Sequence, residues 1–391
     1  MELTVGYHHF HDDVSLNFQC NRWVQWIGSS AVAEVTALAS RCQTYPEWID
    51  GFLGLAVAAR EAERPLAAAY YERAAEFFMT PDDPRRPGAR NRFLQTMRDL
   101  FDVTPDEVPY ASSSLPAFDL HPQAETSSTI LIFGGFDSYI EEFLPMLFAM
   151  VDAGHRVIAF EGPGQGSALE EGGLPMTPEW ERPVSAVLDH YRLDDVTAIG
   201  ESLGGGLVIR AAAFELRITR VVCMDILDDF LEVLGRQIGR GVTPVLRVLL
   251  ALRARGFVNA IARNAMTRKP VAAWGVQQGM HITGTATPFD FLRAATALNT
   301  RRASQKVTGD VLLLAGADDH YVPLKQLGHQ AAGLVRARSV TTRTFTAAEQ
   351  ASNHCQVGNI AAALRVIQSW LEVTDTSRMA EKLDTAEQFA R

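Results

Sequence analysis

The pentapeptide Gly200-Glu201-Ser202-Leu203-Gly204 sets a serine between glycines, directly after the apolar, β-branched run Val196–Ile199. A helical pattern covers residues 206 to 214 beyond it. A serine on such a tight strand-to-helix turn exposes its hydroxyl, and the amino end of the helix favours developing negative charge. We therefore predict that Ser202 is a nucleophile. A glycine-rich turn with an incidental serine is the alternative.

A serine nucleophile needs a base to accept its proton, and the chain has ten histidines as candidates. His354 alone lies in a loop between a strand-like run, Ser339–Phe345, and the last helical run, Asn359–Glu372. Enzymes built on this serine turn carry their base in that place. We predict that His354 is the base, and a loop histidine without a role is the alternative.

The acid of such a site comes between the serine and the histidine along the chain, and it orients the imidazole and stabilises its protonated form. It should follow the last strand-like run but one. The residue three places after Gly316 and four before Pro323 is Asp319, which is the predicted acid. Two alternatives stay open: Asp318 beside it, and Asp225 at the end of the preceding strand.

An oxyanion forms during acyl transfer, and backbone N–H groups can stabilise it. The amide of Leu203, directly after the nucleophile, should supply one donor, and the loop after an early strand the other. That loop contains Gly134 and Gly135, whose missing side chains let the backbone curl toward a substrate. We predict that the amide of Phe136 is the second donor. A tight turn of purely structural role is the alternative for the two glycines.

Four residues are candidates for contact with the substrate, namely Gly135, Asp137, Tyr321 and His281. Gly135 and Asp137 flank Phe136, and Tyr321 follows the predicted acid. His281 stands in an apolar stretch bracketed by glycines, where a polar side chain could face a substrate. A structural role suits His281 somewhat better.

These groups need a scaffold, and the pattern of the chain predicts one. From about residue 106, short apolar runs bounded by glycine or aspartate alternate with helical stretches, which is typical of a mostly parallel sheet with helices on both faces. The expected strands are Thr129–Phe133, Arg156–Phe160, Val196–Ile199, Arg220–Met224 and Asp310–Leu314. Together with the serine turn, this order predicts the α/β-hydrolase fold.

The domain boundaries follow from changes in this pattern. Residues 1–105 are predicted to form an N-terminal helical domain, and residues 106–226 and 306–374 the two parts of the α/β core. Residues 227–305 are too many for a loop and mostly helical in pattern, so we expect an inserted helical cap. Residues 375–391 form a polar C-terminal tail, expected to be frayed or a loosely docked helix.

The composition limits the class of function. The 391 residues are 47% hydrophobic and carry a formal net charge of −10 without any basic cluster, so we expect no nucleic-acid partner. The four cysteines form neither a CxxC pair nor a regular framework, and His8, His9 and His11 fit a solvated terminus better than a metal site. No signal peptide and no apolar run of membrane-spanning length is evident, so a cytoplasmic enzyme without membrane contact is expected.

The glycine-rich stretch 161–166, Glu-Gly-Pro-Gly-Gln-Gly, lacks the spacing of a dinucleotide-binding fingerprint. No acidic residue follows it at the place expected on a next strand. We expect a scaffold role for this stretch, with no cofactor and no metal.

Several segments together resemble a known group. They are Asn-Phe-Gln at 17–19 with Asn-Arg-Trp at 21–23, Gly-Gly-Phe-Asp-Ser at 134–138 with Glu-Glu at 141–142, and the stretches 161–166, 200–205, 278–280 and 354–359. The pattern is similar to that of α/β-hydrolases related to 2,6-dihydroxypseudooxynicotine hydrolase and to the fungal chain-shortening hydrolases of polyketide pigment pathways. The resemblance implies an N-terminal helical domain over a standard core, commonly a homodimer, no cofactor, and ketone or ester substrates. Related enzymes of tetronate antibiotic pathways eliminate acetate instead.

The leading hypothesis is therefore cleavage of an acyl group from a small polyketide-like or aromatic metabolite. The bond would be a carbon–carbon bond of a β-diketone-like ketone, or an ester. The alternative is a lyase that eliminates an acyloxy group such as acetate. A ligand-binding receptor on an inactive hydrolase scaffold is a third hypothesis, which the complete set of Ser202, Asp319 and His354 disfavours.

Overall fold

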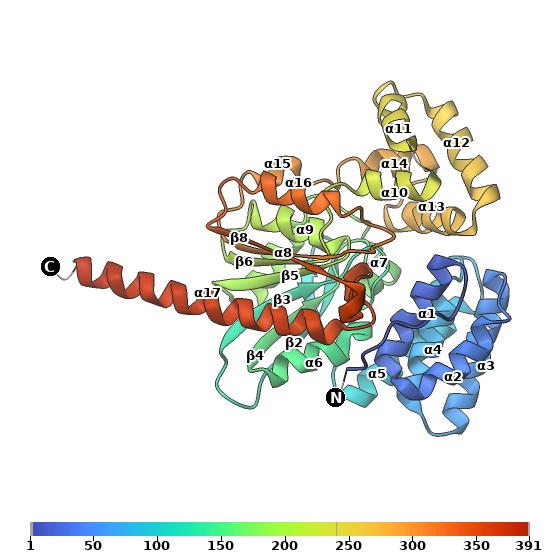
Figure 1. The fold of residues 1–391 in the computed structure, drawn as a ribbon, viewed down its shortest axis with the longest axis horizontal. Coiled ribbons are helices and arrows are strands. Elements are labelled where there is room, and N and C mark those ends of the chain that lie inside the picture. Colours follow the sequence, from blue (N-terminus) through green and yellow to red (C-terminus); the bar gives the residue numbers. More distant parts are fainter. Residues whose placement is uncertain (1–2, 240, 390–391) are drawn as a thin grey trace.

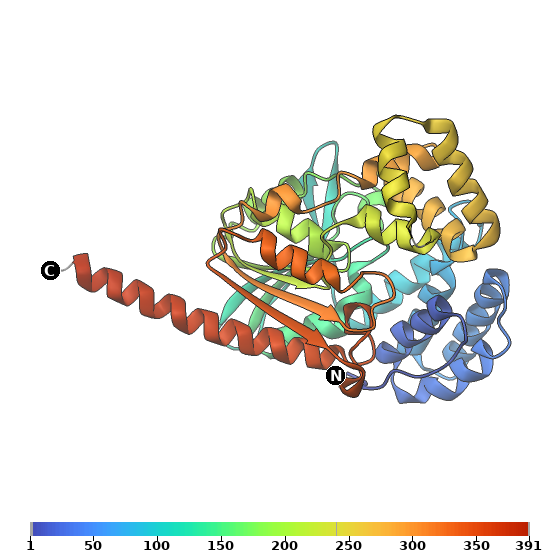
Figure 2. The same ribbon diagram turned by 45° about the horizontal axis from the view of Figure 1, so that its top comes forward.

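One eight-stranded sheet forms the centre of the protein (Figures 1 and 2). The computed structural model describes residues 3–239 and 241–389, with side chains up to residue 376. The strands are β1 Asp106–Tyr110, β2 Ser113–Leu120, β3 Ser128–Phe133, β4 His155–Phe160, β5 Val196–Glu201, β6 Ile218–Met224, β7 Asp310–Gly316 and β8 Ser339–Phe345. Their order across the sheet is β1-β2-β4-β3-β5-β6-β7-β8, and β2 is antiparallel to both of its neighbours while all other pairs are parallel.

This architecture confirms the predicted fold class, and the five expected strands are present. The β1–β2 hairpin was not predicted. β1 lies at the edge of the sheet and is mostly exposed, so it has no buried apolar run, and Pro116 interrupts the apolar stretch of β2 in the sequence. Proline lacks the N–H that an inner strand donates, and the edge position of β1 tolerates Pro109.

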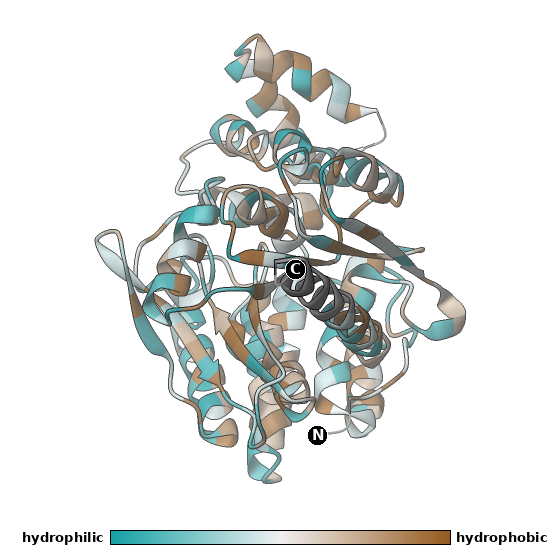
Figure 3. Ribbon diagram, turned by 90° about the vertical axis from the view of Figure 1, so that its left-hand side faces the viewer, coloured by the Kyte–Doolittle hydropathy of each residue, from teal (hydrophilic) through white to brown (hydrophobic). Residues whose placement is uncertain are grey.

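The core has two apolar layers, one on each face of the sheet. In β3, Ile130 and Ile132 face one layer and Leu131 and Phe133 the other, as the two-residue period of a strand requires. Helices α6 (Leu144–Asp152) and α17 (Ile360–Phe389) cover the first face, and α8 (Glu181–His190), α9 (Gly204–Ala212) and α16 (Lys325–Gly333) the second. Figure 3 shows apolar stretches in the central strands and apolar residues alternating with polar ones along the helices.

Five helices precede the sheet: α1 Val14–Ile27, α2 Val32–Ala39, α3 Tyr45–Glu61, α4 Pro65–Phe77 and α5 Arg86–Phe101. Their starts have local causes. The Asp13 carboxylate accepts two backbone N–H bonds at the start of α1, and Thr44 and Glu47 form a capping box at α3. These helices dock on the core through buried ion pairs, among them Arg73 with Glu142.

Between β6 and β7, five helices lie above the sheet beside the N-terminal helices, and the short helix α15 (Arg301–Ser304) then leads into β7 (Figure 1). They are α10 Phe230–Ile238, α11 Val242–Ala251, α12 Arg255–Arg268, α13 Pro270–Ile282 and α14 Pro288–Ala295. The indole N–H of Trp274 on α13 donates to the carbonyl oxygen of Phe77 on α4 over 2.8 Å, so this group of helices touches the N-terminal helices directly.

The end of the chain, expected to be frayed or a loosely docked helix, continues α17 without a break from Ile360 to Phe389. Its last turns extend away from the body of the protein (Figure 1). Among the described residues, no helix has the length and apolar character needed to cross a membrane.

Candidate active site

Ser202 stands on the sharp turn between β5 and α9. Its φ angle is +58°, in the left-handed region that few residues other than glycine adopt, so the turn stores local strain. A Cβ atom on Gly200 would overlap the carbonyl oxygen of Gly204, so the close approach of these two segments requires glycine. The strand-turn-helix context expected around the pentapeptide is present.

In space, the imidazole of His354 lies between the side chains of Ser202 and Asp319, although Ser202 is 152 positions and Asp319 is 35 positions earlier in the sequence. Its Nε2 atom is 2.8 Å from Ser202 Oγ, and its Nδ1 atom is 2.7 Å from Asp319 Oδ2. The second carboxylate oxygen of Asp319 accepts the backbone N–H groups of Tyr321 at 2.7 Å and Val322 at 2.9 Å. These bonds leave Asp319 one orientation, and Asp319 in turn orients the imidazole toward the serine hydroxyl.

The charges of Asp319 and His354 depend on each other. Burial by itself would raise the pKa of Asp319, but the neighbouring imidazolium and the hydrogen bonds lower it below its usual value. Burial would likewise lower the pKa of His354, but the charge of Asp319 raises it well above the usual value of histidine. The pair therefore favours a protonated imidazole next to an ionised carboxylate, which is the charge state that proton removal from Ser202 creates.

The structure separates the three candidate acids by distance. Asp318 is exposed, whereas Asp319 is 7% exposed and hydrogen-bonded to His354. Asp225, buried at the end of β6, places Oδ2 at 4.0 Å from His354 Nδ1. Burial and the nearby charge of Asp319 raise the pKa of Asp225 well above its usual value, so Asp225 is the neutral member of the two carboxyl groups.

Two backbone amides lie next to the serine. Among the described residues, neither the N–H of Phe136 nor that of Leu203 donates to a protein acceptor. Gly135 packs so closely on the serine turn that a Cβ atom there would come within 2.8 Å of the Leu203 nitrogen. The two donors thus stand on adjoining segments with their hydrogen-bonding capacity unused, as an oxyanion hole requires.

The loop that carries Phe136 is held by side chains. Ser138 Oγ accepts the N–H of Gly135 at 3.1 Å, and Gln165 Nε2 donates to the carbonyl oxygen of Gly134 at 2.6 Å. Gln165 belongs to the glycine-rich stretch 161–166, for which the sequence indicated a scaffold role. Its amide holds the loop in place without facing the cavity.

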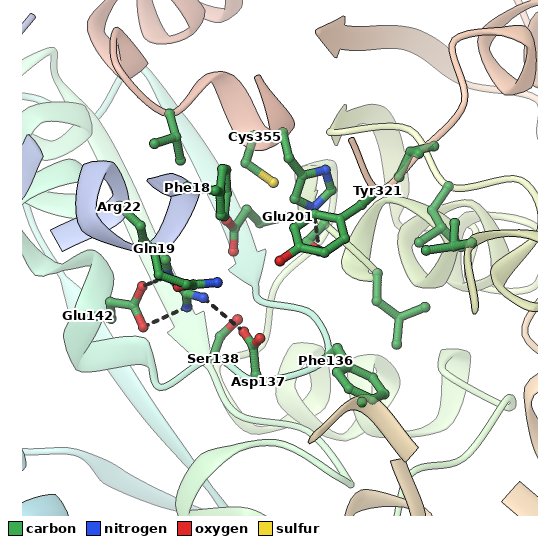
Figure 4. A pocket seen from close by; sticks show the side chains of 18 of the residues that line it. Phe18, Gln19, Arg22, Phe136, Asp137, Ser138, Glu142, Glu201, Tyr321 and Cys355 are labelled. Carbon is green, nitrogen blue, oxygen red and sulfur yellow. Dashed lines mark hydrogen bonds and ion pairs between the residues drawn. The ribbon is translucent and has the colours of Figure 1, made fainter. Parts of the chain in front are cut away.

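A cavity of about 110 Å³ opens above Ser202 and His354 (Figure 4). Three parts of the chain enclose it: α1 with Phe18, the core loops with Phe136, and the inserted helices with Phe230 and Trp274. Aromatic and aliphatic side chains form most of its wall. A small, enclosed, largely apolar cavity with a few polar groups is typical of a site for a small organic molecule.

The substrate-contact candidates divide into two groups. Asp137 and Tyr321 line the cavity, and Gly135 adjoins it at the serine turn. His281 does not reach it. Its Nε2 atom pairs with Glu170 Oε1 at 2.9 Å, away from Ser202, so the structure does not bring His281 into this site.

Two further residues of the wall, Arg22 and Glu201, were not predicted as site residues. Arg22, on α1, bonds Glu142 through Nε at 2.6 Å and Nη2 at 2.9 Å, and Asp137 through Nη1 at 3.2 Å. Burial raises the pKa of Glu201 to about 7, against the opposing charge of Arg22. Both stood in motifs singled out in the sequence, but only the fold shows that their side chains face one cavity (Figure 4).

Comparison with known proteins agrees with this fold. The model of the alpha/beta hydrolase fold family matches residues 129–346, and the chain belongs to that family. It is 30% identical to the hydrolase acrC of Aspergillus aculeatus over 298 residues, which cover 67% of this chain and 68% of the relative. It is also 30% identical to the 20-hydroxy-prefusarin hydrolase FUS2 of Gibberella moniliformis over 285 residues, 66% of each chain.

Solved structures show the same fold over nearly the whole chain. The crystal structure of 2,6-dihydroxy-pseudo-oxynicotine hydrolase has a TM-score of 0.62 at 18% identity, covering 90% of this chain and 94% of that one. The structure of AbyA5 has a TM-score of 0.67 at 18% identity, covering 93% and 95%. The family match and the curated relatives, together with this shared fold, confirm the family resemblance inferred from the motifs.

Proposed function

We propose that this chain is a serine-nucleophile enzyme that removes an acyl group from a small polyketide-like or aromatic metabolite. The bond cleaved is a carbon–carbon bond of a β-diketone-like ketone, or an ester bond. The observation that carries the proposal is the 2.8 Å contact of Ser202 Oγ with His354 Nε2 beneath a largely apolar cavity.

Each residue has a role in this proposal. Ser202 attacks the carbonyl carbon while His354 Nε2 accepts its proton, and Asp319 stabilises the resulting imidazolium. The amides of Phe136 and Leu203 hold the oxyanion. When the carbon–carbon or ester bond breaks, His354 returns the proton to the enolate or alkoxide that leaves. Water, activated by His354, then cleaves the acyl-serine and releases a carboxylic acid.

The kind of substrate is supported by the cavity and by the relatives. Aromatic side chains such as Phe18, Phe136 and Trp274 form part of the largely apolar wall, which suits a planar or aromatic acyl compound, and a β-diketone has a stabilised enolate as its leaving group. A fungal relative is named for hydrolysis of 20-hydroxy-prefusarin. The cytoplasmic location and the homodimer stay predictions from the sequence.

Labelled water tests hydrolysis against elimination. We would incubate the purified protein in ¹⁸O-water with an aryl β-diketone and, separately, with an acetate ester that has a hydrogen on the carbon next to the C–O carbon. The Ser202→Ala variant measures the background. The expected result is one solvent oxygen in each released acid, because water attacks the acyl carbon. Acetate without solvent oxygen would show alkyl–oxygen cleavage and establish the lyase, and no acid from either compound would contradict acyl cleavage.

A further inference from the structure

Helix α1 carries polar side chains into the cavity opposite the serine. Gln19, Arg22 and Gln25 line it at intervals of three residues, which places them on one side of the helix. Glu201, the residue before the nucleophile, contributes a carboxyl group to the same part of the wall (Figure 4). An otherwise apolar cavity therefore has one polar region, formed by the N-terminal helices and the serine turn together.

The cations of this region are already paired with carboxylates. The Arg22 guanidinium is bonded to Glu142 and Asp137, all three lining the cavity. Arg73, behind them, also pairs with Glu142 at 3.3 Å, so the two guanidinium groups balance the two carboxylates before Glu201 is considered. This group offers a substrate carboxylate or phosphate no unpaired cation, so the region suits a neutral molecule.

Hydrogen-bond acceptors are in excess in this region. Gln19 is only 2% exposed, yet its Oε1 atom has no hydrogen-bond partner among the described residues. The Glu201 carboxyl group hydrogen-bonds the Cys355 thiol, a weak donor, and forms no ion pair with any residue that the structure describes, although Arg22 lies in the same wall. A buried acceptor without a donor, such as Gln19 Oε1, costs free energy, and the Glu201 carboxylate retains lone pairs beyond its thiol contact, so both groups are suited to receive a donor from a ligand.

We propose that Gln19 and Glu201 form a subsite that accepts hydrogen bonds from a hydroxyl group of a neutral substrate. The inference rests on the proposed function and narrows it: the acyl compound carries a phenolic, enolic or alcoholic hydroxyl at the end that faces α1. A site that is completed by a substrate hydroxyl discriminates against the analogue without it, because the acceptors are then left unpaired.

Matched aryl β-diketones test the subsite. We would compare 1-phenylbutane-1,3-dione with its ortho, meta and para hydroxyl derivatives, and with a carboxyl derivative as the anion. For the wild type we expect at least one hydroxyl derivative to have a kcat/KM about 10-fold to 100-fold above the parent, and the carboxyl derivative to fall below it. Equal kcat/KM values for the parent and every hydroxyl derivative would overturn the subsite.

Two variants assign the preference to the named residues. Gln19→Met keeps the length of the side chain and removes the acceptor, and Glu201→Gln at pH 8 removes the charge that strengthens the bond. Both should reduce the hydroxyl-to-parent ratio of kcat/KM, mainly through KM for the hydroxyl compound. Gln95→Leu, on the exposed side of α5, is the matched control and should keep the wild-type ratio. An unchanged ratio in both Gln19→Met and Glu201→Gln would refute the assignment.

Binding without turnover separates this inference from the proposed function. Calorimetry on Ser202→Ala with the same compounds measures their dissociation constants whether or not the wild type cleaves them. A hydroxyl preference that Gln19→Met abolishes in the Ser202→Ala background supports the subsite even if no acyl cleavage is found. Equal dissociation constants for all neutral compounds would contradict it even if cleavage occurs.

Discussion

Asp225 Oδ2 lies 4.0 Å from His354 Nδ1, so the proposed base has a second carboxyl group close to its acid partner. The two carboxyl groups are not equivalent. Asp225 accepts the backbone N–H of Ile226 at 2.8 Å, and burial and the charge of Asp319 raise its pKa well above the usual value. Asp319, hydrogen-bonded to His354, holds the negative charge. This asymmetry leads to the first prediction.

Asp319→Asn should lower kcat/KM about 10³-fold to 10⁴-fold, because the imidazole loses its charge partner and its tautomer. Asp318→Asn is the matched control, exposed and one residue away, and should stay within about twofold of the wild type. Steady-state kinetics of both variants measure this. Similar losses in the two variants, or a larger loss in Asp318→Asn, would show that the acid is misassigned.

Ser202→Ala should abolish turnover by about 10⁴-fold or more, since the other two residues act only through the nucleophile. A fluorophosphonate probe should modify the wild type stoichiometrically on the peptide that contains residues 200–206 and leave the variant unmodified. Circular dichroism should show an unchanged fold, and Ser112→Ala, in the exposed β1–β2 turn, should react with the probe like the wild type. Activity within tenfold of the wild type would exclude a covalent acyl-serine.

The pH dependence should follow the protonation of His354. Only the neutral imidazole can accept the serine proton, and Asp319 raises the pKa of His354 above its usual value of about 6.5. The kcat/KM should therefore fall as the pH decreases through a pKa above 6.5, and Asp319→Asn should move this acidic limb to lower pH. Glu201→Gln removes the other nearby group with a pKa near neutrality and should keep the limb. A limb that disappears in Glu201→Gln would assign the titration to Glu201 instead.

His281→Ala should affect stability and leave catalysis nearly unchanged. The variant removes one hydrogen-bond partner of Glu170. Burial by itself would raise the pKa of Glu170, but His281 and Arg86 together lower this pKa to about 2. Loss of one such bond should cost about 0.5–1.5 kcal/mol and lower the melting temperature. The kcat/KM should stay within about threefold. A large loss of kcat/KM at an unchanged melting temperature would show that His281 contacts the substrate after all.

The sequence predicted the fold class well because the strongest signals of this fold lie within short stretches of adjacent residues. The serine turn needs glycines within a few positions, and buried parallel strands are short apolar runs, so both leave a pattern in adjacent residues. The β1–β2 hairpin has a weaker signal, because β1 is mostly exposed and Pro116 interrupts the apolar stretch of β2. The continuation of α17 to Phe389 was likewise not evident, because a polar helical segment and a frayed tail have similar compositions.

Identifying the candidate site required both the sequence and the tertiary structure. The sequence by itself determined which residue types stand at the ends of successive strands, and hence that Ser202, Asp319 and His354 could meet at one edge of a parallel sheet. Only the tertiary structure decided that Gln19 and Arg22, about 180 positions before the serine, line the same cavity, and that His281 does not. The physical reason is that docking of the N-terminal and inserted helices on the core depends on packing between distant segments, which no periodicity in adjacent residues records.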